Sequence, residues 1–353
     1  MAANICLQTT VIGSYPKPAY MKLTDWFKDN SVKRVTKDYS AMIAEKGMNE
    51  LIDKAEDEVL REQVGLGINI ITDGEIRREN YMYYLLRHLK GFDFFNLTDN
   101  HPMRNPKYVH SVPTIVGPLE IVDESKLAGE WRKCQDVSEV PVKYTIPGPM
   151  TIIESTSNKF YSDVEKLSEA IVLILKKVIK ELVKAGCKHI QIDEPLFARI
   201  PARAIDYGIR HAASCFQDVG SDVTKIIHIC CGYPDRLDQT DYLKADRSSY
   251  LTLAGHLDEA VFDAVSIEDA HCHNDLSFLK MFTKTSVILG CVAIAKSQVE
   301  SVAEIQERIC EALKYIPAER LQIAPDCGLG YLPHDILVQK LTNMVTAAKL
   351  VNI

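Results

Sequence analysis

Short runs of apolar, mostly β-branched residues recur along the chain, separated by helical or irregular stretches. Near-continuous apolar runs of this kind are typical of parallel strands that are covered on both faces. The chain contains eight of them: Thr10–Ser14, Ile68–Asp73, Val142–Pro147, His189–Asp193, Lys225–Cys230, Ala264–Glu268, Ser286–Val292 and Leu321–Asp326. We therefore predict eight strands in a largely parallel sheet.

Helical patterns lie between several of these runs. In Val164–Lys184 apolar residues recur at steps of three and four, and Gly186 follows as a stop signal. Val299–Leu313 and the charged segment Met42–Gln63 are also predicted to be helical. A strand-then-helix order repeated about eight times predicts an α/β fold, a (β/α)8 TIM barrel formed by residues 1–353 as a single catalytic domain. An open, doubly wound sheet is the alternative.

The segment 76–141 departs most from the even spacing of strands. It contains the aromatic run Tyr81–Tyr84, and its Val116–Leu119 stretch predicts a β-hairpin. We expect an insertion after the second strand that lies near the mouth of the barrel. A surface insertion without a role is the alternative.

Composition narrows the range of functions. The chain has 353 residues, of which 46% are hydrophobic and 25% charged, and its net charge of −7 argues against a nucleic-acid partner. No apolar run reaches the ~18 residues that span a membrane, and the N-terminal residues show no signal-peptide pattern. Ten cysteines are too few for a disulfide scaffold. We expect a cytoplasmic protein whose clustered cysteines serve metal binding or catalysis.

Polar side chains stand at the C-terminal ends of most of the runs, the face on which barrel enzymes gather their chemistry. His228 and Cys230 are two residues apart, so they lie on one face of a strand. Glu268 ends the next run, and Cys327 follows the last one. Two thiolates and an imidazole favour Zn²⁺ over Mg²⁺ or Ca²⁺. The run His271-Cys272-His273 is a rival cluster, for which a loop role near the site is the alternative.

Seven short motifs resemble, in the same order, those of the C-terminal catalytic barrel of the cobalamin-independent methionine synthase family. They cover nearly the whole chain, which has the length of a single barrel. The motifs are IGSYP (12–16), DGE (73–75), IPGPMTI (146–152), QIDEP (191–195), HIC (228–230), SIED (266–269) and PDCGL (325–329).

The resemblance implies a zinc-dependent methyltransferase that activates a thiol, homocysteine, as a zinc-bound thiolate for methyl transfer. The implied zinc ligands are His228, Cys230, Glu268 and Cys327. Ile12, Gly13 and Ser14 match the segment that holds homocysteine, and Glu75 and Asp193 match carboxylates that bind its ammonium group. Gly148, Pro149 and Glu194 lie where the family forms the pocket for the second substrate.

The chain departs from the family on the side of the methyl donor. Ser155 stands where the family has a Trp that stacks on the pterin of methyltetrahydrofolate. Ala295 replaces the family's proton-donating His, which leaves the next residue, Lys296, as the candidate acid. The thiol side is therefore retained while the donor side differs. The alternative function is a zinc-dependent alkyl transferase or C–S lyase that acts on another thiol with a non-folate donor.

Two further classes of function compete with this interpretation. A decarboxylase, such as the uroporphyrinogen decarboxylases of the same superfamily, would leave the four metal-type residues unexplained. A non-enzymatic zinc or thiol sensor would keep the metal set and could dispense with a donor pocket. The partners that we expect are a small-molecule thiol and a methyl donor, and the sequence leaves the oligomeric state open.

Overall fold

The computed structural model describes residues 7–23, 25, 39–100, 110–234, 236–242 and 244–351. Its centre is a curled, eight-stranded parallel sheet in the order β1-β11-β10-β9-β8-β7-β5-β2. A parallel bridge between Thr10 and Ile70 joins the two ends of this order, which is consistent with a TIM-like barrel. The strands are β1 (Gln8–Thr9), β2 (Ile71–Thr72), β5 (Val142–Pro147), β7 (His189–Asp193), β8 (Thr224–Ile229), β9 (Ala264–Ile267), β10 (Ser286–Val292) and β11 (Leu321–Pro325).

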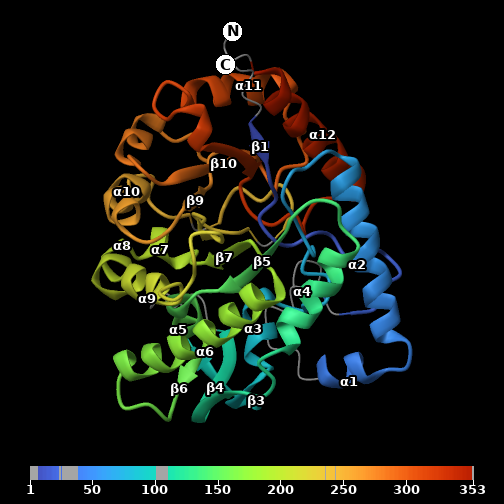
Figure 1. Ribbon diagram of the computed structural model, residues 1–353, viewed down its shortest axis with the longest axis vertical. Helices are drawn as coiled ribbons and strands as arrows, with labels where there is room; N and C mark the ends of the chain where they lie inside the picture. Colours follow the sequence, from blue (N-terminus) through green and yellow to red (C-terminus); the bar gives the residue numbers. More distant parts are fainter. Residues whose placement is uncertain are drawn as a thin grey trace.

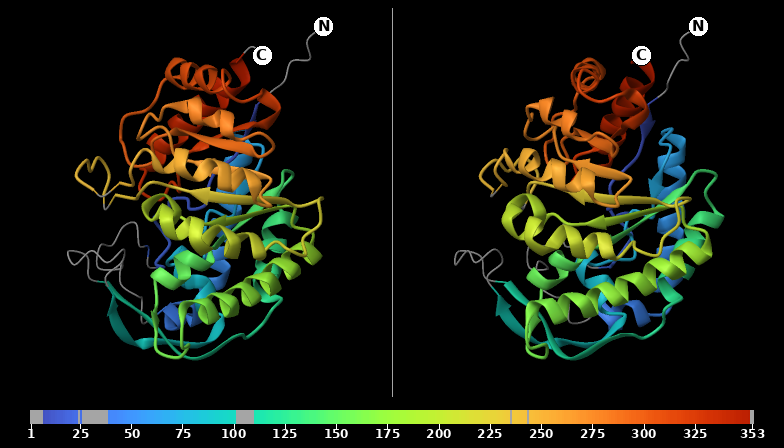
Figure 2. Two further views of the ribbon diagram at one scale, coloured as in Figure 1. Left: turned by 90° about the vertical axis from the view of Figure 1, so that its left-hand side faces the viewer. Right: turned by 60° about the vertical axis from the view of Figure 1, so that its left-hand side comes forward.

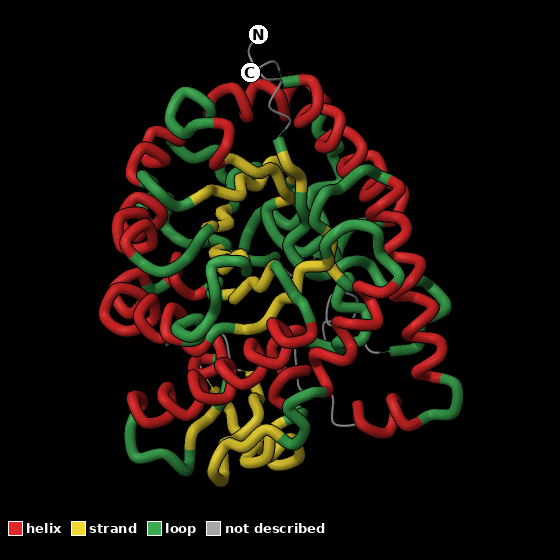
Figure 3. The backbone as a smooth tube through the Cα atoms, in the orientation of Figure 1, coloured by secondary structure: helices red, strands yellow, loops and turns green. Residues whose placement is uncertain are grey.

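Helices surround the sheet on its outer side (Figures 1 and 3). A π-helical turn (Ala204–Gly208) and two 3-10 segments (Leu276–Met281 and Ala318–Arg320) complete the layer. The helices are α1 (Tyr39–Ala44), α2 (Met48–Gly65), α3 (Tyr81–Leu86), α4 (Lys126–Asp136), α5 (Pro149–Glu154), α6 (Val164–Ala185), α7 (Leu196–Arg199), α8 (Pro201–Arg203), α9 (Ile209–Ser214), α10 (Ser249–Glu259), α11 (Val302–Ala312) and α12 (His334–Leu350). None of the described helices is long and apolar enough to cross a membrane.

The two faces of the sheet bury different side chains. Residues such as Ile227 and Val265 belong to the large core that the sheet shares with the helices. Their neighbours along the same strands point to the other face, because successive side chains alternate. A second buried cluster lies on that inner face and consists of Ile12, Ile226, Ala264, Ile288 and Ala324. The polar residues at the strand ends share this inner face.

An antiparallel pair of strands, β3 (Leu89–Asn100) and β4 (His110–Ile121), stands apart from the central sheet. The short strand β6 (Ser157–Asn158) pairs with β4 in parallel, and α6 lies between this small sheet and the central one (Figure 2). An antiparallel pair is therefore present within 76–141. The expected hairpin at Val116–Leu119 is wrong in position, because these residues lie inside β4, at an irregularity in its pairing with β3.

The predicted strands agree with the structure where the apolar runs are clearest. Val142–Pro147, His189–Asp193 and Ser286–Val292 are strands with the predicted bounds. The first strand was misplaced: β1 ends at Thr9, and the apolar residues after it form an irregular segment. The helix predicted over Met42–Gln63 is interrupted, because Gly47 has φ +83°, a left-handed conformation that a helix cannot contain.

Candidate active site

A cluster of one imidazole and two thiols lies at the C-terminal ends of β8 and β11. His228 is on β8, Cys230 follows that strand, and Cys327 follows β11. One potential ligand atom from each of these residues lies within 4.8 Å of the others, and His228 Nε2 is 3.4 Å from Cys327 Sγ. Such a set of soft donors suits Zn²⁺, so the residues present fit the metal that the sequence predicts.

A side chain on the neighbouring strand β9 orients the ring of His228. Its Nδ1 lies 2.9 Å from the hydroxyl oxygen of Ser266 on β9, and both side chains are buried. A hydrogen bond at Nδ1 fixes the ring orientation and leaves Nε2 facing Cys327. The strand register produces this contact, since His228 and Ser266 are paired neighbours on β8 and β9.

The pKa values of the two thiols are shifted in opposite directions. A hydrogen bond from Cys327 holds the pKa of the Cys230 thiol well below its usual value, and His228 acts in the same direction. The same hydrogen bond, together with burial, raises the pKa of Cys327. The lowered pKa favours the thiolate form of Cys230, which is the form of cysteine that binds a metal.

Glu268, the fourth predicted ligand, lies in an adjoining cluster. Its carboxylate forms an ion pair with Lys244 and accepts a hydrogen bond of 2.9 Å from the backbone N–H of Cys231. The thiol of Cys272 also approaches the Glu268 carboxylate, at 3.3 Å. The structure thus brings together three of the four predicted ligands, and the fourth role stays a prediction.

Asp326 organises the loop that follows Glu268. Its carboxylate accepts hydrogen bonds of 2.8–2.9 Å from the backbone N–H groups of Asp269, Ala270 and His271, and one of 2.7 Å from His271 Nδ1. Glu268, His271 and Asp326 also lie close enough to hold a cation, but the Asp326 oxygens are already occupied by these donors. A structural role for Asp326 explains all of these contacts.

The rival cluster at 271–273 does not converge on one point. The His271 ring donates to Asp326, whereas the sulfur of Cys272 lies 3.4 Å from Lys244 Nζ. His273 is exposed and has φ +46°. Their side chains therefore serve different neighbours, as expected for a loop role near the site.

Two buried carboxylates lie at the same ends of the neighbouring strands, and Asp193 is the register neighbour of His228. Glu75 follows β2, and its Oε1 accepts hydrogen bonds from Thr145 at 2.8 Å and from Arg78 at 3.4 Å. Asp193 ends β7, and its Oδ1 accepts a hydrogen bond of 2.7 Å from Gln191. Burial raises the pKa of both groups, that of Asp193 to about 7, with the charge of Glu75 adding to the effect.

The segment Ile12–Ser14 fits between this carboxylate side and the thiol cluster. A Cβ atom on Gly13 would lie 2.7 Å from the Glu75 carboxylate, so only glycine permits the approach. A Cβ atom on Gly328, next to Cys327, would lie 2.1 Å from the Ser14 hydroxyl. The predicted substrate segment therefore touches both sides of the site.

Three of the four residues predicted for the second-substrate pocket form a packed turn. Glu194 accepts hydrogen bonds from the backbone N–H groups of Met150 and Thr151, at 2.9 and 3.0 Å, and so caps the start of α5. A Cβ atom on Gly148 would meet its carboxylate at 2.2 Å. Gly148, Pro149 and Glu194 are all buried. Burial raises the pKa of Glu194 to about 8.

The remaining donor-side residues are more accessible. Ser155 is partly exposed at the end of α5, and its hydroxyl lies 3.2 Å from the sulfur of Met82. Lys296 is exposed in the loop after β10, and Ala295 beside it is buried. Their roles in a reaction stay predictions.

Two tyrosines line the site without having been singled out in the sequence. The hydroxyl of Tyr233 donates a hydrogen bond of 2.5 Å to the carbonyl of Gly328, and its ring packs against Tyr331. Burial raises the pKa of Tyr81 well above its usual value, and the negative charges of Asp193 and Cys230 act in the same direction. The aromatic run that contains Tyr81 was visible in the sequence, but nothing in it indicated which ring faces the site.

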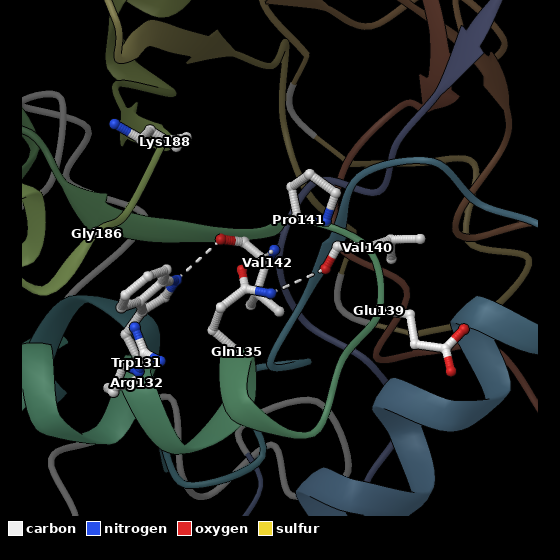
Figure 4. Close-up of a pocket in the computed structure, with 9 residues that line it drawn as sticks. All are labelled: Trp131, Arg132, Gln135, Glu139, Val140, Pro141, Val142, Gly186 and Lys188. Carbon is white, nitrogen blue, oxygen red and sulfur yellow. Dashed lines mark hydrogen bonds between the residues drawn. The ribbon is translucent and has the colours of Figure 1, made fainter.

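The pocket drawn in Figure 4 is not part of this site. It has a volume of about 300 Å³ and lies beside Val142, the first residue of β5, whereas the candidate site lies at the other ends of the strands. Trp131 donates a hydrogen bond of 2.8 Å to the carbonyl of Val142 there. Its two basic residues, Arg132 and Lys188, are paired with Asp136 and Asp222.

The fold and the site together define an α/β-barrel-like protein with a cysteine–histidine centre at the carboxyl ends of its strands. Residues 7–350 match the model of the cobalamin-independent synthase catalytic domain, so the chain belongs to this family. It is a methionine synthase-like, cobalamin-independent enzyme of the methyltransferase class.

Individual relatives agree with this family. The chain is 32% identical to the methionine synthase of Pyrococcus furiosus over 97% of this chain and 92% of that protein. It is 30% identical to that of Thermococcus kodakarensis, over 98% and 93%. A B12-independent methionine synthase from Shewanella sp. W3-18-1, solved in complex with selenomethionine, matches with a TM-score of 0.82 and 25% identity, over 98% of this chain and 97% of that one.

Proposed function

We propose that this enzyme is a zinc-dependent S-methyltransferase that uses homocysteine as the methyl acceptor. The observation that carries the proposal is the convergence of His228, Cys230 and Cys327, three soft donors within 4.8 Å of one another. These residues would hold the metal, with Glu268 as the fourth ligand. Bound zinc lowers the pKa of a coordinated thiol and so supplies a thiolate at neutral pH.

The protein's own residues would bind and orient the amino-acid part of the substrate. Glu75 and Asp193 would form charge-assisted hydrogen bonds to the α-ammonium group, and Ile12–Ser14 would hold the substrate between them and the thiol cluster. In the reaction a bond forms between the substrate sulfur and the methyl carbon. The bond from that carbon to the donor breaks, and its electron pair leaves with the donor. The selenomethionine bound to the Shewanella relative supports an amino-acid site.

The donor side supports a second candidate, a transfer from a non-folate donor or a reaction on another thiol. No aromatic ring stands at position 155, where the Ser155 hydroxyl contacts Met82, and Ala295 offers no proton to a leaving group. A non-folate donor whose leaving group needs no proton would require neither the family's Trp nor its His. Incubating the enzyme with homocysteine and either methyltetrahydrofolate or methylcobalamin, with methionine as the readout, separates these donors.

The first test of the proposal is the metal content of the purified protein, followed by zinc-edge X-ray absorption during titration with homocysteine. We expect about one zinc per chain and an increase in sulfur ligation when homocysteine is added. A protein without zinc, or one whose zinc ligation does not change when homocysteine is added, would contradict the proposal. A thiolate site also needs reduced cysteines, which supports the expectation that the enzyme works in the cytoplasm.

A further inference from the structure

Lys143 lies inside the barrel and takes no part in the mechanism above. It is the second residue of β5, and its side chain points to the inner face, because Val142 and Tyr144 on either side belong to the outer core. Only 1% of the residue is exposed. Its Nζ donates a hydrogen bond of 2.6 Å to the carbonyl of Val11.

A buried lysine is costly unless its charge is balanced. The titratable groups that face Lys143 come from two elements: Glu75 after β2, and Asp193 and His189 on β7. Burial lowers the pKa of Lys143 to about 7, whereas Asp193 and Glu75 oppose this shift. Burial and the charge of Lys143 lower the pKa of His189 to about 4, so this imidazole stays neutral near pH 7. The two carboxylates of the site therefore favour the charged form of Lys143.

Lys143 also fixes the backbone that precedes the predicted substrate segment. The carbonyl of Val11 accepts from Lys143, and the next carbonyl, that of Ile12, accepts a hydrogen bond of 3.0 Å from Gln191. Gln191 in turn donates to Asp193. Inward side chains of the adjacent strands β5 and β7 thus hold two consecutive carbonyls and connect them to the carboxylate side of the site.

We propose that Lys143 is a positioning residue for the amino-acid substrate, which holds the Val11–Ser14 segment and balances the charges of Glu75 and Asp193 from inside the barrel. The role rests on the proposed function for its substrate, an α-amino-acid thiol. Without this cation two neighbouring buried carboxylates would repel each other, and the ammonium group would lose its fixed partners.

The variants Lys143→Met and Lys143→Gln separate the two parts of this role. Methionine keeps the length of the side chain and removes both the charge and the donor, whereas glutamine keeps a donor without the charge. Lys340 supplies a matched control, since it is equally buried but donates to Gln298 and Glu300 on another side of the molecule. Lys340→Met reports the general cost of removing a buried lysine.

In steady-state kinetics we expect Lys143→Met to raise the KM for homocysteine by about tenfold or more, while kcat and zinc content change little. Lys143→Gln should recover part of the loss, and Lys340→Met should leave KM within about twofold of the parent. A KM for Lys143→Met equal to that of Lys340→Met would overturn the proposal, and so would loss of zinc in step with the rise in KM.

Hydrogen exchange gives a second measurement that needs no substrate. In Lys143→Met the amides of residues 11–14 should exchange faster than in the parent, while in Lys340→Met they should not. Unchanged exchange in this segment would overturn the positioning role. If the parent enzyme ignores homocysteine but the exchange behaves as expected, the choice of substrate is wrong and the role of Lys143 in holding the segment stands.

Discussion

The two sides of the candidate site are built in different ways. On the thiol side, His228, Cys230 and Cys327 face one another, and the Ser266 hydroxyl supports the His228 ring. On the carboxylate side, Glu75 and Asp193 are each held by neighbouring side chains, Thr145 and Gln191 among them. On the thiol side the sulfur and nitrogen atoms could bind a metal. On the carboxylate side the hydrogen bonds that hold Glu75 and Asp193 are already formed without substrate.

This difference implies that metal binding and substrate binding should be lost independently of each other. Losing a sulfur should remove the metal and leave the carboxylates in place, because Thr145, Arg78 and Gln191 hold them independently of the cysteines. Losing a carboxylate should weaken substrate binding and leave the metal in place. The following predictions are ordered from the largest expected effect to the smallest.

Substitution of a cluster cysteine should have the largest effect. In Cys230→Ala and Cys327→Ala we expect stoichiometric zinc and methyl transfer to be lost together, because two donors cannot hold the ion as three or four do. Elemental analysis and a methionine assay measure both. The exposed Cys310 provides the control, and Cys310→Ala should keep its zinc. Retention of one zinc per chain in both cluster variants would refute the ligand set.

Neutralising a carboxylate should affect the substrate alone. In Asp193→Asn and Glu75→Gln the charge-assisted contact to the ammonium group is lost, which costs about 1.5–3 kcal/mol, or roughly 10–150-fold in affinity. Titration calorimetry with homocysteine measures this change, and elemental analysis should show zinc at the parental level. If zinc disappears as well, the two sides are not independent.

Removing the support behind His228 should have a moderate effect. In Ser266→Ala the ring loses its hydrogen bond at Nδ1 and can rotate, so zinc affinity should fall by about tenfold. Competition with a chromophoric chelator measures this constant. At saturating zinc the KM for homocysteine should match that of the parent, since Ser266 makes no contact with the carboxylate side in the described structure.

The smallest expected effect is the pH dependence of stability caused by Lys143. Its folded pKa of about 7 lies below the usual lysine value of 10.5, so the unfolded chain binds more protons between these values. Stability therefore rises with pH across this window, and Lys143→Met should flatten the rise. Urea unfolding at pH 7.5 and pH 9.5 measures the difference. Equal slopes in the parent and the variant would show that Lys143 keeps its proton on folding and that burial does not lower its pKa.

The residue pattern predicted the strands and the thiol cluster well because both depend on local features. Apolar runs mark strands, and His228 and Cys230 share a face by simple alternation. The placement of Glu268 beside Lys244 was not predictable, because the segment before α10 that carries this lysine has no periodic pattern. The capping role of Glu194 was also missed, because its hydrogen-bond partners belong to α5, which is far away in the sequence.

The first strand shows a different limit. Thr10–Ser14 has the apolar, β-branched character of a strand, yet the strand ends at Thr9. Beyond it, side chains such as Lys143 and Gln191 take the carbonyls that a ladder would have used. These donors come from β5 and β7, far away in the sequence, so no local pattern could reveal them.

The pairing of β1 with β11 has a consequence for how the protein is made. Gln8 lies in register with Gln322, so β1 cannot pair until β11, which is translated much later, has left the ribosome. Contacts between residues so distant in sequence form slowly. The site, which the following residues Gly13 and Ser14 complete, should therefore assemble only after β11 has been translated. A chain released before β11 would lack both Cys327 and the strand that pairs with β1.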